Sequence, residues 1–371
     1  MQTSRVLRVR LETFLLPSAL VAAMILLMIL GSTPGIAGLA ARPATPPYPN
    51  LPLTTYIWTN VTPTNSPPPR AYAAMAYDPS LSGIILFGGS DPMPNGSAVL
   101  YNDTWLFAHG NWTKVNTTNA PPAEGLSNMV YDAKDGYLLL FGGSSSRGLN
   151  NETWEFQKGK WVNVTTRYSP PIVSAPEMAY DPSLGEVVEY SGWGTAASCG
   201  YCSTNGPVPY TWVYSAGVWT NVTKTSQPKG GPSGGRTYGS LAYDPQLRAL
   251  VLVGGSNGRA NPTGTWTYNG TWSKFPSNRT LPATNGQVLA YDPVLTKLVL
   301  FGGAGSKCNA TVCPAPIIWG LGHAGWHKFY TTGSPMTWIF GSMVYYPPGK
   351  ELIYFGGSQY FHDSQSTWSL T

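Results

Sequence analysis

Residues 75–89 read MAYDPSLSGIILFGG: a tyrosine after two small or apolar residues, an Asp-Pro turn, four apolar residues in a row and a glycine pair. A strand that is apolar on both sides is buried on both sides, and the glycines end it. The same order recurs through the chain. Its aligned tyrosines are Tyr77, Tyr131, Tyr180, Tyr243, Tyr291 and Tyr345, spaced by 48 to 63 residues. The chain is therefore a six-fold repeat.

Each repeat continues with a similar set of aromatic residues and glycines. Ten residues after the tyrosines stand Phe87, Phe141, Tyr190, Val253, Phe301 and Phe355, followed by Gly-Gly in all repeats except the third, which has Ser191-Gly192. A first tryptophan follows in every repeat, at Trp105, Trp154, Trp212, Trp266, Trp319 and Trp368. Five repeats add a second, at Trp112, Trp161, Trp219, Trp272 and Trp326. A period near 50 residues with four strands per repeat predicts an all-β, six-bladed β-propeller of antiparallel blades.

The second tryptophan that the sixth repeat lacks occurs before the first repeat. Residues 56–62 read YIWTNVT and resemble VWTNVT at 218–223, the predicted outer strand of the third repeat. We therefore expect the N-terminal strand to complete the last blade. Such closure removes a free sheet edge that would otherwise recruit other chains.

The apolar strand, the glycine pair and the spaced tryptophans resemble the Kelch repeat of the galactose oxidase/Kelch β-propeller superfamily over residues 56–371. The resemblance implies a scaffold and not one function, because this superfamily is functionally mixed. Galactose oxidase itself would imply copper held by histidines and tyrosines. The four histidines here do not group in one predicted loop cluster, so we expect neither a metal nor a cofactor.

The N-terminus has the features of an export segment. Arg5, Arg8 and Arg10 precede an apolar run over residues 14–30, as in a signal peptide or a membrane anchor. We assign residues 1–41 to this hydrophobic helix, whether cleaved or kept, residues 42–55 to a Pro-rich linker, and residues 56–371 to the propeller. The protein is then extracellular or on the cell surface. Net charge is +5, and no basic stripe for nucleic acid is present.

Export also guides the interpretation of cysteines and asparagines. Cys199 with Cys202, and Cys308 with Cys313, are predicted to form two local disulfides, and a shared zinc site is the alternative. Acceptor sequences for N-glycosylation are frequent and follow the tryptophans of several repeats. They are Asn60, Asn95, Asn102, Asn111, Asn116, Asn151, Asn163, Asn221, Asn269, Asn278 and Asn309.

Candidate ligand-binding residues are those that the repeated positions do not account for. Trp193 and Trp338 fall outside the repeated tryptophan positions, in loops expected on one face of the propeller. The segments that lead into the blades, and the long loops of the same face, add charged residues: Arg70, Glu124, Glu177, Arg236, Arg147, Arg259, Asp91 and Asp363. Aromatic platforms with a few charged groups suit a glycan or a peptide.

Two functions fit this pattern. The first is a non-catalytic surface module that binds a glycan or a protein on its loop-rich face. The alternative is a carbohydrate-active enzyme of the sugar epimerase or mutarotase type, with Glu124 or Glu177 as the acid/base, since proton transfer needs only one well-placed carboxyl. Two carboxyls converging in a closed pocket would favour the enzyme, and an open rim would favour binding.

The closure hypothesis predicts that deletion of residues 56–62 opens the ring and lowers the melting temperature. Thermal unfolding of the deletion protein and the full chain, followed by circular dichroism, measures the difference. An unchanged melting temperature would refute closure.

Overall fold

The computed structural model describes residues 56–371 except 93–96, 198–204, 228–230, 233, 278, 306–316, 323–324, 337–338 and 360–361. The predicted N-terminal helix and the Pro-rich linker lie outside these residues. The described chain is almost entirely β, with one short helix, α2 (Thr223–Ser226). Within these same ranges, no helix is long and apolar enough to cross a membrane.

Five sheets of four antiparallel strands follow one another along the chain, and each of the first five repeats supplies one of them. The first sheet contains β2 (Ala74–Asp78), β3 (Gly83–Phe87), β6 (Thr104–Ala108) and β7 (Asn111–Val115). The second contains β9 (Asn128–Asp132), β10 (Tyr137–Phe141), β13 (Thr153–Gln157) and β14 (Lys160–Asn163). The third contains β16 (Glu177–Asp181), β17 (Glu186–Tyr190), β20 (Thr211–Ser215) and β21 (Val218–Asn221). The fourth contains β22 (Thr237–Asp244), β23 (Ala249–Ser256), β24 (Trp266–Tyr268) and β25 (Trp272–Lys274). The fifth is β26 (Thr284–Asp292), β27 (Lys297–Gly305), β28 (Ile318–Gly322), β29 (Gly325–Phe329).

The last sheet joins the two ends of the described chain. It contains β31 (Ser342–Tyr346), β32 (Glu351–Phe355), β35 (Thr367–Leu370), β1 (Tyr56–Asn60) and β30 (Thr331–Thr332). Strand β1 pairs antiparallel with β35, with Trp58 opposite Leu370, and β30 adds to its other edge in parallel. The predicted pairing of the N-terminal strand with the last repeat is confirmed.

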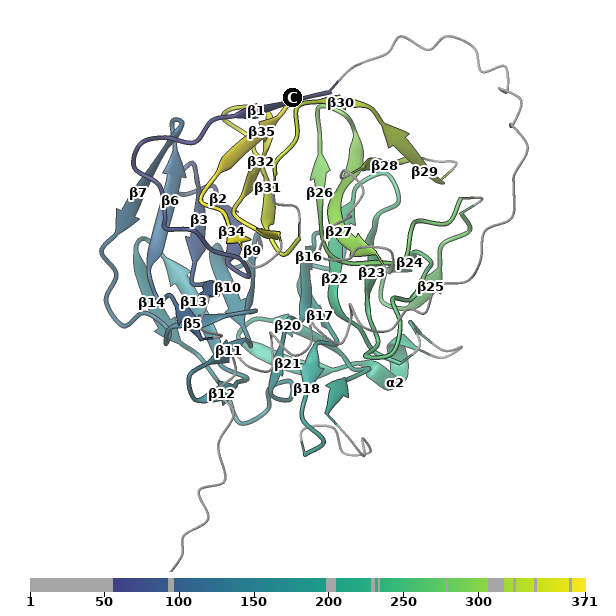
Figure 1. Cartoon of the computed structure of the whole chain (residues 1–371). Helices are drawn as coiled ribbons and strands as arrows, with labels where there is room; N and C mark the ends of the chain where they lie inside the picture. Colours follow the sequence, from purple (N-terminus) through teal and green to yellow (C-terminus); the bar gives the residue numbers. More distant parts are fainter. Residues whose placement is uncertain are drawn as a thin grey trace, which may run out of the picture.

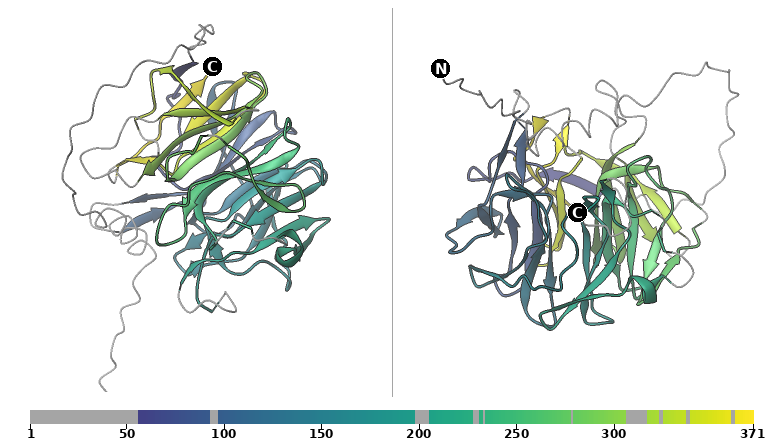
Figure 2. Two further views of the ribbon diagram at one scale, coloured as in Figure 1. Left: turned by 90° about the vertical axis from the view of Figure 1, so that its right-hand side faces the viewer. Right: turned by 90° about the horizontal axis from the view of Figure 1, so that it is seen from below.

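The six sheets stand around a common axis in a propeller-like arrangement (Figures 1 and 2). The first strands of neighbouring sheets contact one another in chain order, and β31 of the last sheet contacts β2 of the first. The second strands, such as β3 and β10, are buried along their length, as their apolar sequences predict. Small two- and three-stranded ladders extend several of the sheets at the end where the glycine pairs lie.

The glycine pairs are needed for their backbone conformation. Gly88 has a φ of 66°, and a Cβ there would lie 2.5 Å from the carbonyl oxygen of Glu124. Ser191 adopts a similar φ of 67° in the third repeat. Its hydroxyl accepts a 2.6 Å hydrogen bond from the backbone N–H of Arg236, which offsets the strain of a side chain in this region. The third sheet therefore forms despite the exception.

The second tryptophans tie each sheet to the one before it. Four of the indoles pack on an aromatic residue of the preceding sheet, as Trp112 does on Phe355 at 5.2 Å between ring centroids, and Trp326 lies in a cluster with Val253. Each also donates its Nε1 proton to a threonine hydroxyl on that sheet. The pairs are Trp112–Thr367 at 2.8 Å, Trp161–Thr104 at 3.0 Å, Trp219–Thr153 at 3.0 Å, Trp272–Thr211 at 2.9 Å and Trp326–Thr265 at 2.8 Å.

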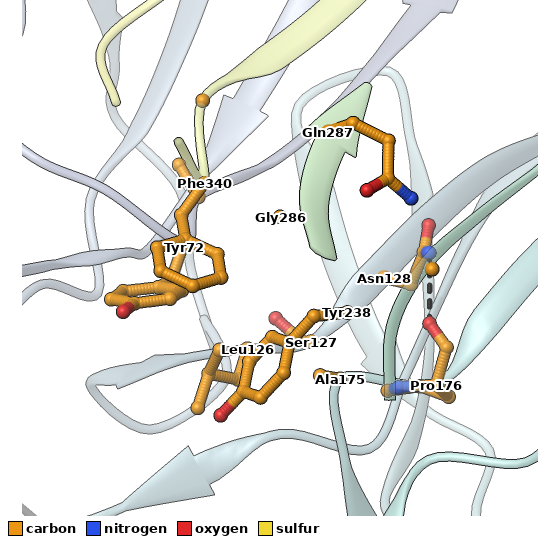
Figure 3. Close-up of a pocket in the computed structure, with 13 residues that line it drawn as sticks. Tyr72, Leu126, Ser127, Asn128, Ala175, Pro176, Tyr238, Gly286, Gln287 and Phe340 are labelled. Carbon is orange, nitrogen blue, oxygen red and sulfur yellow. Dashed lines mark hydrogen bonds between the residues drawn. The ribbon is translucent and has the colours of Figure 1, made fainter. Parts of the chain in front are cut away.

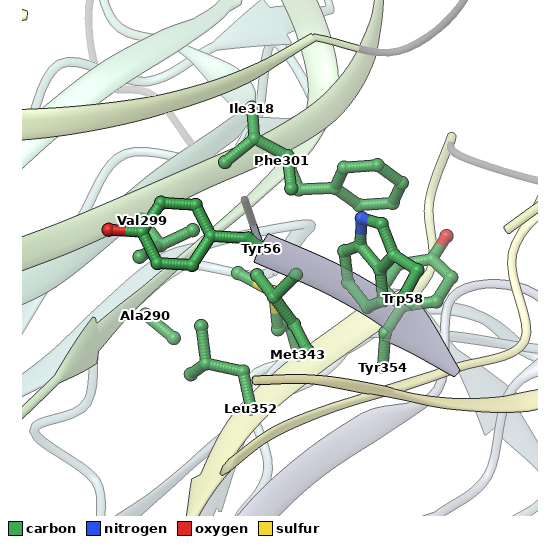
Figure 4. Packing of buried hydrophobic residues seen from close by; sticks show 10 residues of the cluster. Tyr56, Trp58, Ala290, Val299, Phe301, Ile318, Met343, Leu352 and Tyr354 are labelled. Atoms are coloured by element: carbon green, nitrogen blue, oxygen red, sulfur yellow. The ribbon is translucent and has the colours of Figure 1, made fainter. Parts of the chain in front are cut away.

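One joint in the ring lacks this hydrogen bond. Trp58 of β1 packs on Phe301 of the fifth sheet at 4.8 Å. The position that holds threonine in the other repeats is Ile318 in the fifth, so among the described residues the buried Nε1 of Trp58 has no partner. Figure 4 shows the indole nitrogen of Trp58 directed toward the side where Phe301 and Ile318 lie. The joint between the fifth and sixth sheets, which we call the seam, has aromatic packing without the indole–threonine bond of the other joints.

The difference between the joints predicts unequal costs for the same substitution. Trp112→Phe removes a buried hydrogen bond and leaves Thr367 without its donor, whereas Trp58→Phe removes only an unpartnered N–H. We expect Trp112→Phe to lower the free energy of unfolding by about 1 kcal/mol more than Trp58→Phe. Urea unfolding of both variants measures this difference, and equal losses would contradict the role of the indole–threonine bond.

Candidate functional site

Six equivalent residues meet at the centre of the ring. They lie five positions before the aligned tyrosines, where the chain turns into the first strand of each sheet, and all have left-handed backbone angles. These axial residues are Tyr72 (φ 59°), Leu126 (65°), Ala175 (48°), Tyr238 (60°), Gly286 (70°) and Phe340 (60°). Non-glycine residues rarely adopt this conformation, and its cost is tolerated only where the surroundings enforce it.

Backbone hydrogen bonds from sheet to sheet enforce that conformation. The N–H of Leu126 donates to the carbonyl of Tyr72 at 3.1 Å, and that of Ala175 donates to Leu126 at 2.7 Å. On the other side of the ring, Tyr72 donates to Phe340 at 2.9 Å and Phe340 to Gly286 at 2.8 Å. Five of the axial residues, from Gly286 through Phe340, Tyr72 and Leu126 to Ala175, are therefore linked in a hydrogen-bonded chain, which together with Tyr238 we call the collar.

A pocket of about 120 Å³ opens at this collar. On one side it has an aromatic wall of Tyr72, Tyr238 and Phe340 (Figure 3). The Phe340 ring lies 4.6 Å from Tyr72 and 5.1 Å from Tyr238 between centroids, so the three rings form one apolar surface. These rings come from the first, fourth and sixth sheets.

The opposite wall carries neutral polar groups. Asn128 donates from Nδ2 to the carbonyl of Pro176 at 3.0 Å, and Gln287 donates from Nε2 to the carbonyl of Val253 at 3.2 Å. The Gln287 side chain is 4% exposed, and its Oε1 has no hydrogen-bond partner among the described residues. The residues that line the pocket within the described chain include no charged side chain. The site is suited to a small, uncharged group with an apolar face and hydrogen-bond donors.

The charged residues predicted from the sequence are placed differently. Arg70 is fully buried, forms an ion pair with Asp103 at 2.6 Å and lies 3.9 Å over the ring of Tyr101. Arg236 is also buried and donates to the carbonyl of Gly254 at 2.9 Å. Both residues are buried and bonded within the protein, and their expected part in ligand binding stays a prediction.

The two candidate acid/base residues are buried as well. Glu124 is 2% exposed and accepts a 2.8 Å hydrogen bond from Nδ2 of Asn150, and burial raises its pKa to about 8. Glu177 is 2% exposed and accepts a 2.7 Å bond from the N–H of Gly239, and burial raises its pKa to about 8 too. The two carboxyls belong to different repeats and have different partners, so they do not form an acid/base pair.

The other predicted residues do not line this pocket or lie outside the described chain. Trp193, in β18 (Trp193–Gly194), is partly buried and pairs with Ser174 and Pro207. Arg147 and Arg259 are exposed. Asp91 and Asp363 lie on short loop strands of the first and sixth repeats, where burial raises the pKa of Asp363 to about 7. Trp338, all four cysteines, Asn95, Asn278 and Asn309 lie outside the described residues, so the disulfide and zinc hypotheses stay open.

The remaining glycosylation acceptors are mostly accessible. Asn151 is partly buried, and the other seven described acceptors are exposed: Asn60, Asn102, Asn111, Asn116, Asn163, Asn221 and Asn269. Exposure permits modification of these side chains, and whether they carry glycans stays a prediction.

Comparison with known proteins adds no family. No protein-family model matches the chain, and no curated protein is similar to it. Within the described ranges, no group of three or more His, Cys, Asp and Glu side chains lies close enough to hold a metal ion. The function must therefore be argued from the pocket itself.

The buried glutamates predict a pH dependence of stability. In the folded state Glu177 keeps a proton up to about pH 8, whereas in the unfolded chain it loses that proton near pH 4.5. The free energy of unfolding therefore falls as pH rises through this window. Glu177→Gln keeps the acceptor for Gly239 and should raise the free energy of unfolding at pH 8 by on the order of 1–3 kcal/mol.

Urea unfolding at pH 5 and pH 8 tests this expectation. The gain should be much smaller at pH 5, because this pH lies close to the pKa of 4.5 that the carboxyl has in the unfolded chain. Glu152→Gln, at a partly buried carboxyl on the second sheet, is the matched control and should show no such gain. An equal gain at both pH values would show that Glu177 is not protonated in the folded protein.

Proposed function

We propose that residues 56–371 form a six-bladed, Kelch-like β-propeller that acts as an extracytoplasmic binding module. Its loop-rich face would hold a surface glycan or a protein. Residues 14–30 would direct export and, if uncleaved, anchor the module in a membrane, with the Pro-rich linker as a spacer. The sixfold repeat and the ring of sheets support the propeller assignment.

The observation that carries the binding function is the axial pocket. Its walls are three aromatic rings and neutral polar groups, at or just before the start of the first strands. Four predicted residues, Arg70, Arg236, Glu124 and Glu177, are buried and bonded within the protein, and the pocket itself is lined by neutral residues. A preorganised, uncharged, aromatic surface is better suited to holding a ligand than to acid/base chemistry.

One specific observation favours the enzyme as a second candidate. Glu177 accepts its hydrogen bond from Gly239, which itself lines the pocket, and its Oε2 has no partner among the described residues. Burial raises the pKa of Glu177 to about 8, so at neutral pH this carboxyl would hold a proton beside the site. A sugar epimerase or mutarotase could use such a group as a general acid.

A glycan array and a cell-envelope pull-down with residues 42–371 test the binding function. We expect a sugar or envelope component that is retained by the parent protein and lost in the Trp193→Ala/Trp338→Ala double variant. Tyr330→Ala, at a residue 73% exposed beside β30, is the control and should bind normally. Unchanged binding by the double variant would refute the assignment of these tryptophans to the binding face.

Turnover distinguishes the two candidates. Free sugars incubated with the protein and followed by NMR should not change their anomeric or epimeric composition faster than without it. Turnover that Glu177→Gln abolishes, with ligand binding preserved, would establish the enzyme instead.

A further inference from the structure

The Gln287 side chain presents an unused hydrogen-bond acceptor to the axial pocket. Its Nε2 is engaged by the carbonyl of Val253, and the residue is held in place because Ser240 donates from its hydroxyl to the Gln287 carbonyl at 2.8 Å. The Oε1 atom is buried and has no partner among the described residues. A buried acceptor without a donor is unfavourable, and a ligand or an ordered water can satisfy it.

The aromatic wall adds a second, independent indication of a ligand. Tyr72, Tyr238 and Phe340 hold left-handed backbone angles that glycine would adopt without strain, as Gly286 does in the fifth repeat. Backbone strain of this kind is often retained at ligand sites, and here it places three aromatic rings on one pocket. In Figure 3 the aromatic rings gather on one side of the pocket and the Gln287 amide lies on the other.

The dimensions and charge of the pocket restrict the ligand. A volume of about 120 Å³ admits one ring or its edge, not an extended oligomer. The lining carries no charge, so an acidic or basic group would lose its solvation without gaining a partner. The ligand must offer an apolar face to the rings and a hydrogen-bond donor to Gln287 on its other side.

We propose that the axial pocket binds a single neutral sugar residue, with a C–H face on Tyr72, Tyr238 and Phe340 and a hydroxyl donating to Oε1 of Gln287. This inference rests on the proposed binding function and names its ligand class. A peptide that inserts an uncharged side chain is the competing occupant, and the experiment separates the two.

The test uses the full chain in a detergent without a sugar headgroup. Methyl α-glucopyranoside, methyl α-mannopyranoside and methyl β-galactopyranoside are titrated and followed by saturation-transfer NMR, with N-acetyl-Ser-amide and N-acetyl-Asn-amide in parallel. At least one glycoside should bind. Gln287→Met keeps the length of the side chain, removes the acceptor and should weaken that binding about tenfold.

Gln246→Met is the matched control, because Gln246 is exposed on the turn between β22 and β23, at the opposite end of these strands from Thr237. It should bind as the parent does. A set of deoxyfluoro glycosides is also titrated against the unaltered protein, so that the test does not depend on the folding of a variant. Fluorine accepts but cannot donate, so one position should lose binding about tenfold.

Each outcome bears on one of the two proposals. Full binding by Gln287→Met, no loss at any fluorinated position, or binding of the amides alone would overturn the sugar assignment. If array binding is lost in the Trp193→Ala/Trp338→Ala variant but retained by Gln287→Met, the binding module stands and the axial pocket is not its site. If the unaltered protein binds neither glycans nor envelope components, both proposals fail.

Discussion

The hydrogen bond from a tryptophan indole to a threonine on the preceding sheet holds this ring together. A single four-stranded sheet of this size cannot bury both of its faces, so each sheet depends on its neighbours. The indole fills the gap between two sheets, and its N–H fixes their relative position. Five joints share this bond, and the axial collar adds hydrogen bonds on the inside. The sheets are thereby fixed at both their outer and inner edges.

Fixing both edges has a consequence for the site. The pocket walls come from residues at or just before the start of first strands, and most of the axial residues among them are linked by backbone hydrogen bonds. A preorganised site loses little conformational entropy on binding. Arg70 joins the segment before the first sheet to Asp103 through two hydrogen bonds, two residues before Tyr72 of the collar.

The sequence predicts the scaffold well because its signals are local and repeated. The apolar second strands, the glycine pairs and the string around Trp58 each report a strand or a turn within a few residues, and the pairing of β1 with β35 follows from them. The axial site was not predicted. Its residues share a position but not a type, since tyrosine, leucine, alanine, glycine and phenylalanine all occur there. Arg70 was expected on the surface because its partner, Asp103, is distant in sequence and became evident only in the folded chain.

The seam distinguishes one joint of the ring from the other five as the place where local unfolding would begin. Six equal joints would offer six equivalent routes for unfolding to begin, and none would be preferred. Here Trp58 meets Ile318 without a hydrogen bond, in a sheet that the chain builds from segments far apart in sequence. Local opening selects the weakest cooperative unit, so β1 is the segment that would detach first while the other five joints persist. In this fold of similar repeats, the one different joint would therefore make unfolding begin at a defined place, which six identical joints would not do.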